Sequence, residues 1–150
     1  MIYFFWALVI FLTSIIKGKI SFFGVPPNFT SVLVYYVGMR NGGLRGVLFG
    51  SLIGSVEDSL SGALLGPNLL SKGIVGYFSS LMSGSFFRWT PLLGAIGISL
   101  LTTVDNILTL MSRSFFDRMP VSVEAAVFIT AIQSLINAPL GIFLRPKNKH

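Results

Sequence analysis

Ionisable side chains within long apolar segments are the residues of this 150-residue chain whose types could do chemistry. Glu57 and Asp58 are adjacent acids, Lys72 follows, and Asp105 immediately precedes Asn106. A charged side chain at the centre of a bilayer costs roughly 2.5–3.5 kcal/mol, so such groups pair internally or line a polar cavity. We therefore expect these residues to form either an internal ion pair or a functional site.

Positions along the predicted helices place these charges at a similar depth. With a rise of about 1.5 Å per residue, Asp58 lies roughly 20 Å beyond Arg45, and Asp105 lies a similar distance beyond Pro91. Lys72 lies about a turn and a half into the helix that returns between them. We predict that the charges converge in the outer part of the membrane.

Two interpretations of this outer polar cluster stay open. In the structural one, Lys72 pairs with one of the acids, and Asn68 and Asn106 assist the pair. In the functional one, the cluster forms an outward-facing polar cavity or a partner-docking site, because intramembrane ionisable groups are functional candidates by default. Its members are Glu57, Asn68, Lys72, Asp105 and Asn106.

Small residues recur every four positions in the middle of the chain. The series begins at Gly38 and includes Gly50, Gly54, Gly62 and Gly66. Asp58 occupies the position between Gly54 and Gly62 in this series. Residues four apart lie near one helical stripe, and small residues allow helices in lipid to approach closely. The stripe predicts packing within the bundle or a docking face for another membrane protein. In the docking interpretation Asp58 is a polar anchor near the outer surface.

Most catalytic machinery is missing from the sequence. The single histidine is His150 and there is no cysteine, so no His-based triad, proton shuttle or His/Cys metal cluster is expected. No Walker-type loop is present, and the glycines lack the strand context of a dinucleotide site. No serine has a candidate base beside it. We predict no enzyme activity, no cofactor and no metal, although acid chemistry on a lipid stays open.

The composition indicates that the chain resides in a membrane. Hydrophobic residues make up 53% and charged residues 11%, whereas soluble domains carry about 25% charged residues. The apolar stretches are continuous rather than alternating, which favours helices over a barrel. The net charge of +6 comes mainly from cations at expected span ends, where membrane topology puts them. We therefore expect no nucleic-acid partner.

We predict an all-α membrane protein with a single domain, residues 1–150, that forms a bundle of six transmembrane helices. The spans are 1–16, 28–40, 45–61, 67–86, 91–111 and 124–144. The first is expected to be a retained span rather than a cleaved signal, and the second could be a full span or a broken, re-entrant helix. Six spans put both termini on one side. The count of Lys and Arg near span ends favours the cytoplasm for that side, where the basic tail would meet lipid headgroups.

Residues 26–80 resemble the MreD family of rod shape-determining proteins. The shared motif is a glycine, any three residues, a second glycine, any three residues and an aspartate. A glycine-bounded loop and an asparagine follow it. The matching positions are Pro27, Asn28, Arg45, Gly46, Gly50, Gly54, Asp58, Gly62, Gly66, Asn68 and Tyr77. Two departures concern the polar site, because the family often has an acid in place of Asn28, and Glu57 adds an acid beside Asp58.

The resemblance implies a non-enzymatic inner-membrane scaffold of the bacterial elongation machinery. It would bind a bitopic MreC-type partner and help link actin-like filaments to peptidoglycan synthases in the cell-wall synthesis complex. The family is similar in fold to the substrate-binding subunits of energy-coupling-factor transporters, so a vitamin-binding subunit is the alternative. Many of those subunits carry an alanine–three–alanine motif in the first helix. Here residues 2–16 contain a single alanine, Ala7, and therefore lack the motif. Its absence favours the scaffold over the transporter subunit.

Overall fold

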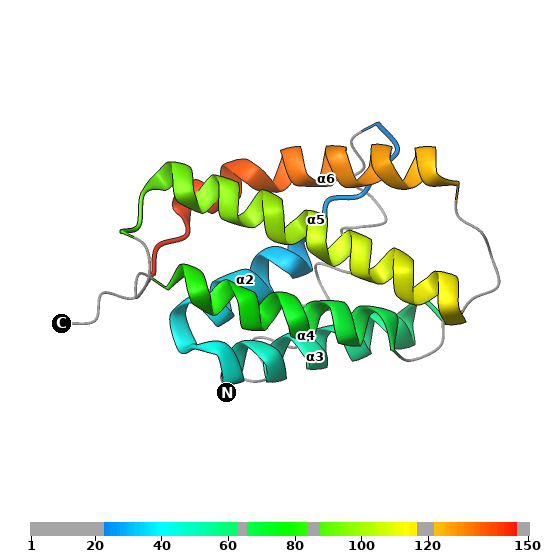
Figure 1. Ribbon diagram of the computed structural model, residues 1–150, viewed down its shortest axis with the longest axis horizontal. Helices are drawn as coiled ribbons and strands as arrows, with labels where there is room; N and C mark the ends of the chain where they lie inside the picture. Colours follow the sequence, from blue (N-terminus) through cyan, green and yellow to red (C-terminus); the bar gives the residue numbers. More distant parts are fainter. Residues whose placement is uncertain (1–22, 63–65, 84–87, 117–121, 147–150) are drawn as a thin grey trace.

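The computed structural model describes residues 23–62, 66–83, 88–116 and 122–146, and the elements within them are helices (Figure 1). The predicted helix at 1–16 lies outside these residues, so the number of six helices stays a prediction. The all-helical class is confirmed for the described part of the chain. The elements are α2 (Phe29–Asn41), α3 (Gly43–Leu60), α4 (Pro67–Ser79), the short 3₁₀ helix η1 (Ser80–Met82), α5 (Pro91–Phe116) and α6 (Val123–Phe143).

Glycine and proline set the helix boundaries near the predicted ranges. Gly42, with φ of +92°, separates α2 from α3, and prolines begin α4 and α5. Helix α2 is unbroken but has 13 residues, so it is only about 20 Å long and shorter than a hydrocarbon core of about 30 Å. Helix α5 continues to Phe116, beyond the predicted end at 111, because no glycine or proline interrupts it there.

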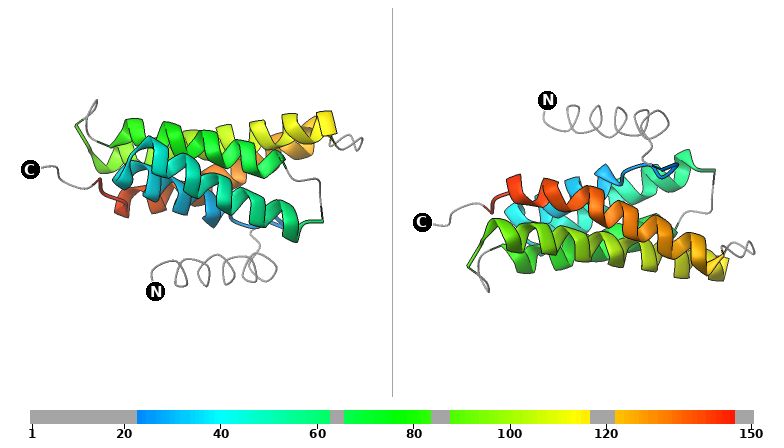
Figure 2. Two further views of the ribbon diagram at one scale, coloured as in Figure 1. Left: turned by 90° about the horizontal axis from the view of Figure 1, so that it is seen from below. Right: turned by 90° about the horizontal axis from the view of Figure 1, so that it is seen from above.

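Helix α2 lies at the centre of the bundle. It contacts α3, α4, α5 and α6, and it runs between the α3–α4 pair and the α5–α6 pair (Figures 1 and 2). Its side chains supply much of the apolar core, with Val34, Tyr35 and Met39 fully buried against Val75 and Ile98. The central position explains why so short a helix is stable: its neighbours, rather than lipid, surround it.

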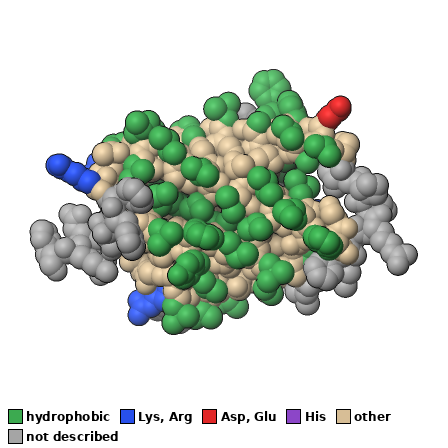
Figure 3. All heavy atoms as spheres, in the orientation of Figure 1, with side chains coloured by type: hydrophobic (Ala, Val, Ile, Leu, Met, Phe, Trp, Pro, Cys, Tyr) green, Lys and Arg blue, Asp and Glu red, His purple; other side chains and the backbone are tan. Residues whose placement is uncertain are grey.

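The surface is apolar along the helices and charged at their ends. Among the described helices, α5 and α6 are long and apolar enough to cross a membrane. Figure 3 shows hydrophobic side chains spread over one face, with Lys and Arg at one end and an acidic side chain at the other. The basic end is where α2 ends, α3 and α5 begin and α6 ends. Its arginines are Arg40, Arg45, Arg88 and Arg145.

Candidate functional site

Glycines hold α3 directly against the backbone of α4. A Cβ atom added at Gly50 would lie 2.1 Å from the carbonyl oxygen of Lys72, and one at Gly54 would lie 2.2 Å from that of Asn68. One at Gly46 would lie 2.2 Å from the carbonyl oxygen of Gly76. Because side chains have no room here, the stripe on α3 is used for packing within the chain. It therefore offers no free face to a partner.

Gly62 and Gly66 do not continue this interface. Helix α3 ends at Leu60, and the two glycines follow it with φ angles of +64° and +153°. A Cβ atom at either position would meet nothing within 4 Å. Their predicted role in helix packing is therefore wrong: the helix stops before them, and they supply left-handed backbone conformations that other residues adopt rarely.

Asp58 binds the first turn of α4. Its carboxylate accepts hydrogen bonds from the backbone N–H groups of Gly66 (2.9 Å), Asn68 (3.1 Å) and Leu69 (3.1 Å) and from Nδ2 of Asn68 (2.8 Å). The N–H groups at a helix start lack intrahelical partners and carry partial positive charge. Asp58 has no exposed surface. The predicted anchor for a partner is thus an internal cap that ties α4 to the end of α3.

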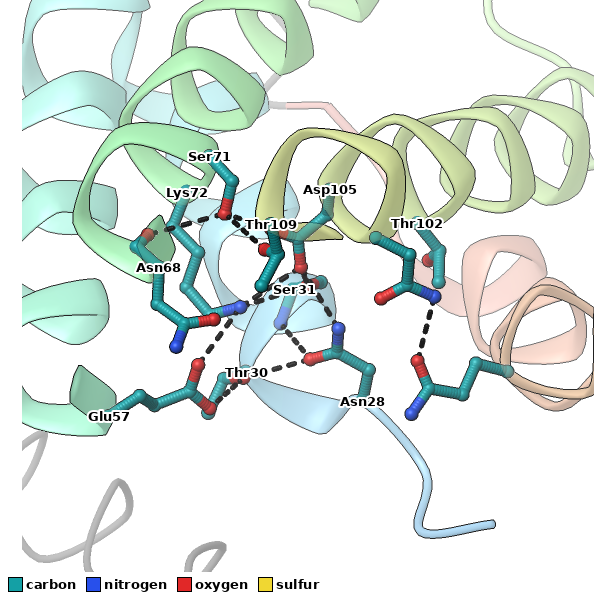
Figure 4. A network of polar contacts seen from close by, with 12 residues as sticks. Asn28, Thr30, Ser31, Glu57, Asn68, Ser71, Lys72, Thr102, Asp105 and Thr109 are labelled. Atoms are coloured by element: carbon teal, nitrogen blue, oxygen red, sulfur yellow. Dashed lines mark hydrogen bonds and ion pairs between the residues drawn. The ribbon is translucent and has the colours of Figure 1, made fainter. Parts of the chain in front are cut away.

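Lys72 lies at the centre of an ion triad (Figure 4). Its Nζ atom is 3.0 Å from Oε2 of Glu57 and 2.9 Å from Oδ2 of Asp105. Only 1% of the side-chain surface of Lys72 and Asp105 is exposed, against 11% for Glu57. The structure therefore brings Lys72 together with two acids rather than the single acid expected. One ammonium and two carboxylates leave a net charge of −1 in this triad.

Three hydrogen-bond donors, two from α2 and its N-cap and one from α4, satisfy the rest of the Asp105 carboxylate. Nδ2 of Asn28 donates at 2.9 Å, Oγ of Ser71 donates at 2.6 Å and Oγ of Ser31 also donates. A buried charge is tolerated when it is both paired and hydrogen-bonded. Oγ1 of Thr30 lies 2.7 Å from Oε1 of Glu57 and supports the second acid in the same way. The triad thus joins α2, α3, α4 and α5.

Asn68 and Asn106 lie near the triad but take other partners than expected. The Asn68 side chain bonds to Asp58, as described above, because it stands in the first turn of α4. Nδ2 of Asn106 donates to Oε1 of Gln133 at 2.8 Å. Adjacent helical residues point about 100° apart, so Asp105 faces Lys72 while Asn106 faces α6. The expectation that both amides assist Lys72 directly is therefore corrected.

Several polar residues of the site had no place in the sequence-based prediction. On α6, Nε2 of Gln133 donates to the carbonyl oxygen of Pro26 at 2.8 Å, and Nδ2 of Asn137 donates to that of Asn28 at 3.2 Å. These bonds fix the extended segment that leads into α2. Two amides four residues apart in an apolar helix are a detectable signal. Ser31 and Ser71 carry no comparable signal in the sequence, because serines in helices usually bond to backbone carbonyls.

A cavity of about 380 Å³ adjoins the triad. It lies between the second half of α5 and the first half of α6, with walls from α3, α4 and the segment before α2. The lining comprises Pro26, Pro27, Asn28, Glu57, Asn68, Lys72, Asp105, Asn106, Thr109, Leu110, Arg113, Ala126, Ile129, Thr130 and Gln133. The outer polar cluster is therefore both a structural ion triad and the wall of a polar cavity.

The arrangement suits recognition by charge and hydrogen bonding better than catalysis. Oγ of Ser31 lies 3.5 Å from Nζ of Lys72, but two carboxylates hold that nitrogen as an ammonium, which has no lone pair to act as a base. Within the described residues, no group of three or more His, Cys, Asp and Glu side chains could hold a metal ion.

Comparison with known proteins identifies one family. The family model described as rod shape-determining protein MreD matches residues 1–146. No curated protein and no solved structure matches the chain.

Proposed function

The chain belongs to the rod shape-determining protein MreD family, and from this premise we propose that it is a non-enzymatic scaffold of the cell-elongation complex. Family membership gives it a role in cell shape at the bacterial membrane. The proposal adds that it binds a bitopic MreC-type partner and supports peptidoglycan synthesis in the inner membrane. The observation that carries the proposal is a family match over residues 1–146.

The distribution of polar groups supports function by association. Polar side chains gather inside the bundle, while leucines such as Leu52 on α3 and Leu135 on α6 are 67% and 75% exposed. Helices in lipid associate through close packing and a few polar contacts. An apolar exterior around a rigid, ion-paired interior is therefore suited to holding another membrane helix in a fixed place.

The charged ends support an orientation with cytoplasmic termini. Arg40, Arg45, Arg88 and Arg145 lie at one end of the described helices, whereas the other end has one arginine, Arg113, and the acid Glu124 in the first turn of α6. The positive-inside rule then places the basic end in the cytoplasm and the polar cavity toward the outside. The multi-pass topology of six spans belongs to this proposal.

The absence of cysteine makes this orientation simple to test. We expect a membrane-impermeant maleimide to label Ser122→Cys in intact spheroplasts and to label Asn41→Cys only after lysis. Both positions are exposed. Labelling in the reverse pattern would place the cavity on the cytoplasmic side.

Photo-crosslinking in the native bacterium tests the scaffold role. A photoreactive residue is placed at Leu52 or Leu70 on the α3–α4 pair, or at Leu100 or Leu135 on the α5–α6 pair, all of them exposed. The expected result is a crosslinked adduct with a single-span protein that has a large periplasmic domain. The adduct should form from one helix pair only, and cell-wall synthases should co-purify with it. The unreactive pair is the matched control. No adduct and no synthase from any position would contradict the proposal.

The polar cavity favours a second candidate, the substrate-binding subunit of a vitamin transporter. A cavity of about 380 Å³ is large enough for a small polar molecule. The alanine–three–alanine motif of those transporter subunits is missing from residues 2–16, which contain one alanine, Ala7. Recovery of ATPase subunits with a second membrane protein, in place of cell-wall synthases, would favour this candidate.

A further inference from the structure

Arg113 is a cavity residue that the ion triad does not use. It lines the same cavity as Glu57, and its Nε atom is buried without a hydrogen-bond partner in the described part of the chain. Arg113 lies eight residues beyond Asp105 on α5, about 12 Å farther along the helix axis. A buried guanidinium N–H normally has an acceptor, and a planar guanidinium is suited to bidentate binding of phosphate or carboxylate.

The cavity therefore carries separated charges of opposite sign. The triad has a net charge of −1, and Glu57 is its most exposed member. Arg113 contributes +1 at the other side of the lining. A complementary ligand has an anionic group for Arg113 and a cationic group for Glu57. Amide and hydroxyl groups of Asn106, Thr130 and Gln133 on the same lining supply further hydrogen-bonding atoms.

The position of the cavity indicates how such a ligand would reach it. Near the basic end, α5 and α6 touch, since a Cβ atom at Gly94 would lie 2.3 Å from the carbonyl oxygen of Gly141. Toward the start of α6 the two helices diverge (Figure 1). Arg113 lies about 33 Å along α5 from Pro91, which is the depth of the opposite headgroup region. Leu110, Ala126 and Ile129 add apolar lining beside the polar wall.

From these observations we propose that the cavity binds a phosphoethanolamine group, with its phosphate on Arg113 and its ammonium on Glu57. A lipid headgroup and a free zwitterion share this chemistry. The site is separate from any partner-binding role, because it lies between helices of this chain and needs no second protein.

The test uses the purified full-length chain in mild detergent. Native mass spectrometry and thermal unfolding are measured with dioleoyl phosphatidylethanolamine, with dioleoyl phosphatidylglycerol and with soluble phosphoethanolamine. We expect the ethanolamine lipid to be retained at least tenfold better than the glycerol lipid and to raise the unfolding temperature. If soluble phosphoethanolamine stabilises the protein equally well, the headgroup alone is the ligand; if only the lipid does, its chains contribute. Equal retention of both lipids would overturn the proposal.

Two variants assign the binding to this cavity. Arg113→Gln removes the phosphate-binding cation, and Ala126→Leu fills the cavity from α6. Ala125→Leu makes the same change at the exposed neighbouring position and serves as the matched control. We expect at least a tenfold loss of retained ethanolamine lipid in the first two variants and no change in the control. Undiminished retention in Ala126→Leu would overturn the proposal even if Arg113→Gln failed to fold.

Discussion

Asp58 and Asp105 are both fully buried aspartates in apolar helices, yet their partners come from very different distances along the chain. The donors to Asp58 are 8 to 11 residues away. Those to Asp105 are 33 to 77 residues away. The first carboxylate closes a helix–turn–helix, whereas the second joins α5 to α2 and α4, which meet only in the folded bundle. One side-chain type thus serves a local and a global purpose.

The source of compensating charge differs in the same way. Asp58 is balanced mainly by backbone N–H groups at the start of α4, with Nδ2 of Asn68 as one side-chain donor. Asp105 is balanced by the Lys72 side chain and by hydroxyl and amide groups. Loss of one donor should therefore affect the Asp105 region far more than the Asp58 region. The following predictions test this comparison.

The largest effect is expected for Lys72→Met. The substitution leaves Glu57 and Asp105 buried without their cation, and breaking a buried pair from one side costs about 3–5 kcal/mol. The free energy of unfolding is measured by denaturant titration in mixed micelles. Glu57→Gln and Asp105→Asn added to Lys72→Met should recover part of the loss. If the triple variant were no more stable than Lys72→Met, the loss would not come from unpaired carboxylates.

A smaller loss is expected for Gly50→Ala. The new methyl group would meet the carbonyl oxygen of Lys72 at 2.1 Å, so α3 and α4 must separate, and overpacking of this kind costs about 1–3 kcal/mol. The thermal unfolding temperature in detergent should fall. Gly43→Ala is the matched control, because its nearest neighbours are side-chain atoms at 3.1 Å. An equal effect of both substitutions would refute close packing at Gly50 as the cause.

Asp58→Asn should destabilise the protein by about 0.5–2 kcal/mol, the range for loss of a helix cap. The amide keeps an acceptor but loses the charge that faces the start of α4. Hydrogen exchange should rise at Gly66, Asn68 and Leu69, whose backbone N–H groups donate to Asp58, and stay nearly unchanged in α2 and α5. Asp105→Asn, as the comparison, should raise exchange in α2, α4 and α5 together. A uniform increase in both variants would remove the distinction between the two regions.

The smallest effect is expected for Asn106→Ala, which removes the bond to Gln133. Interhelical hydrogen bonds in membrane proteins contribute about 0.6 kcal/mol on average. The unfolding free energy should change by about that amount, far less than in Lys72→Met. A loss as large as that of Lys72→Met would show that Asn106 supports the triad after all.

The helices and one helix interface were predictable because they depend on local features. Continuous apolar stretches bounded by glycine, proline or charge predicted α3 and α6 close to their observed ranges and the starts of α4 and α5. The ends of α4 and α5 were wrong, because α4 ends at Ser79 rather than 86 and α5 continues to Phe116. The four-residue glycine spacing predicted a face for close approach, and Gly50 and Gly54 do lie against α4. The pairing of Lys72 with acid was also predictable, since a charge within apolar helices must be compensated.

The identity of each partner was decided by the rotation and register of helices in the bundle. A shift of one residue turns a side chain by about 100°, so Asp105 meets Lys72 while its neighbour Asn106 meets α6. The same geometry directs Asp58 to the start of α4 rather than to a partner protein. The sequence by itself determined the membrane-suited helices, the glycine interface and the need for an ion pair, through periodicity and the cost of buried charge. Only the tertiary structure decided that two acids share Lys72, that Asn137 holds the segment before α2, and that Arg113 faces the cavity, because these contacts join residues far apart in the chain.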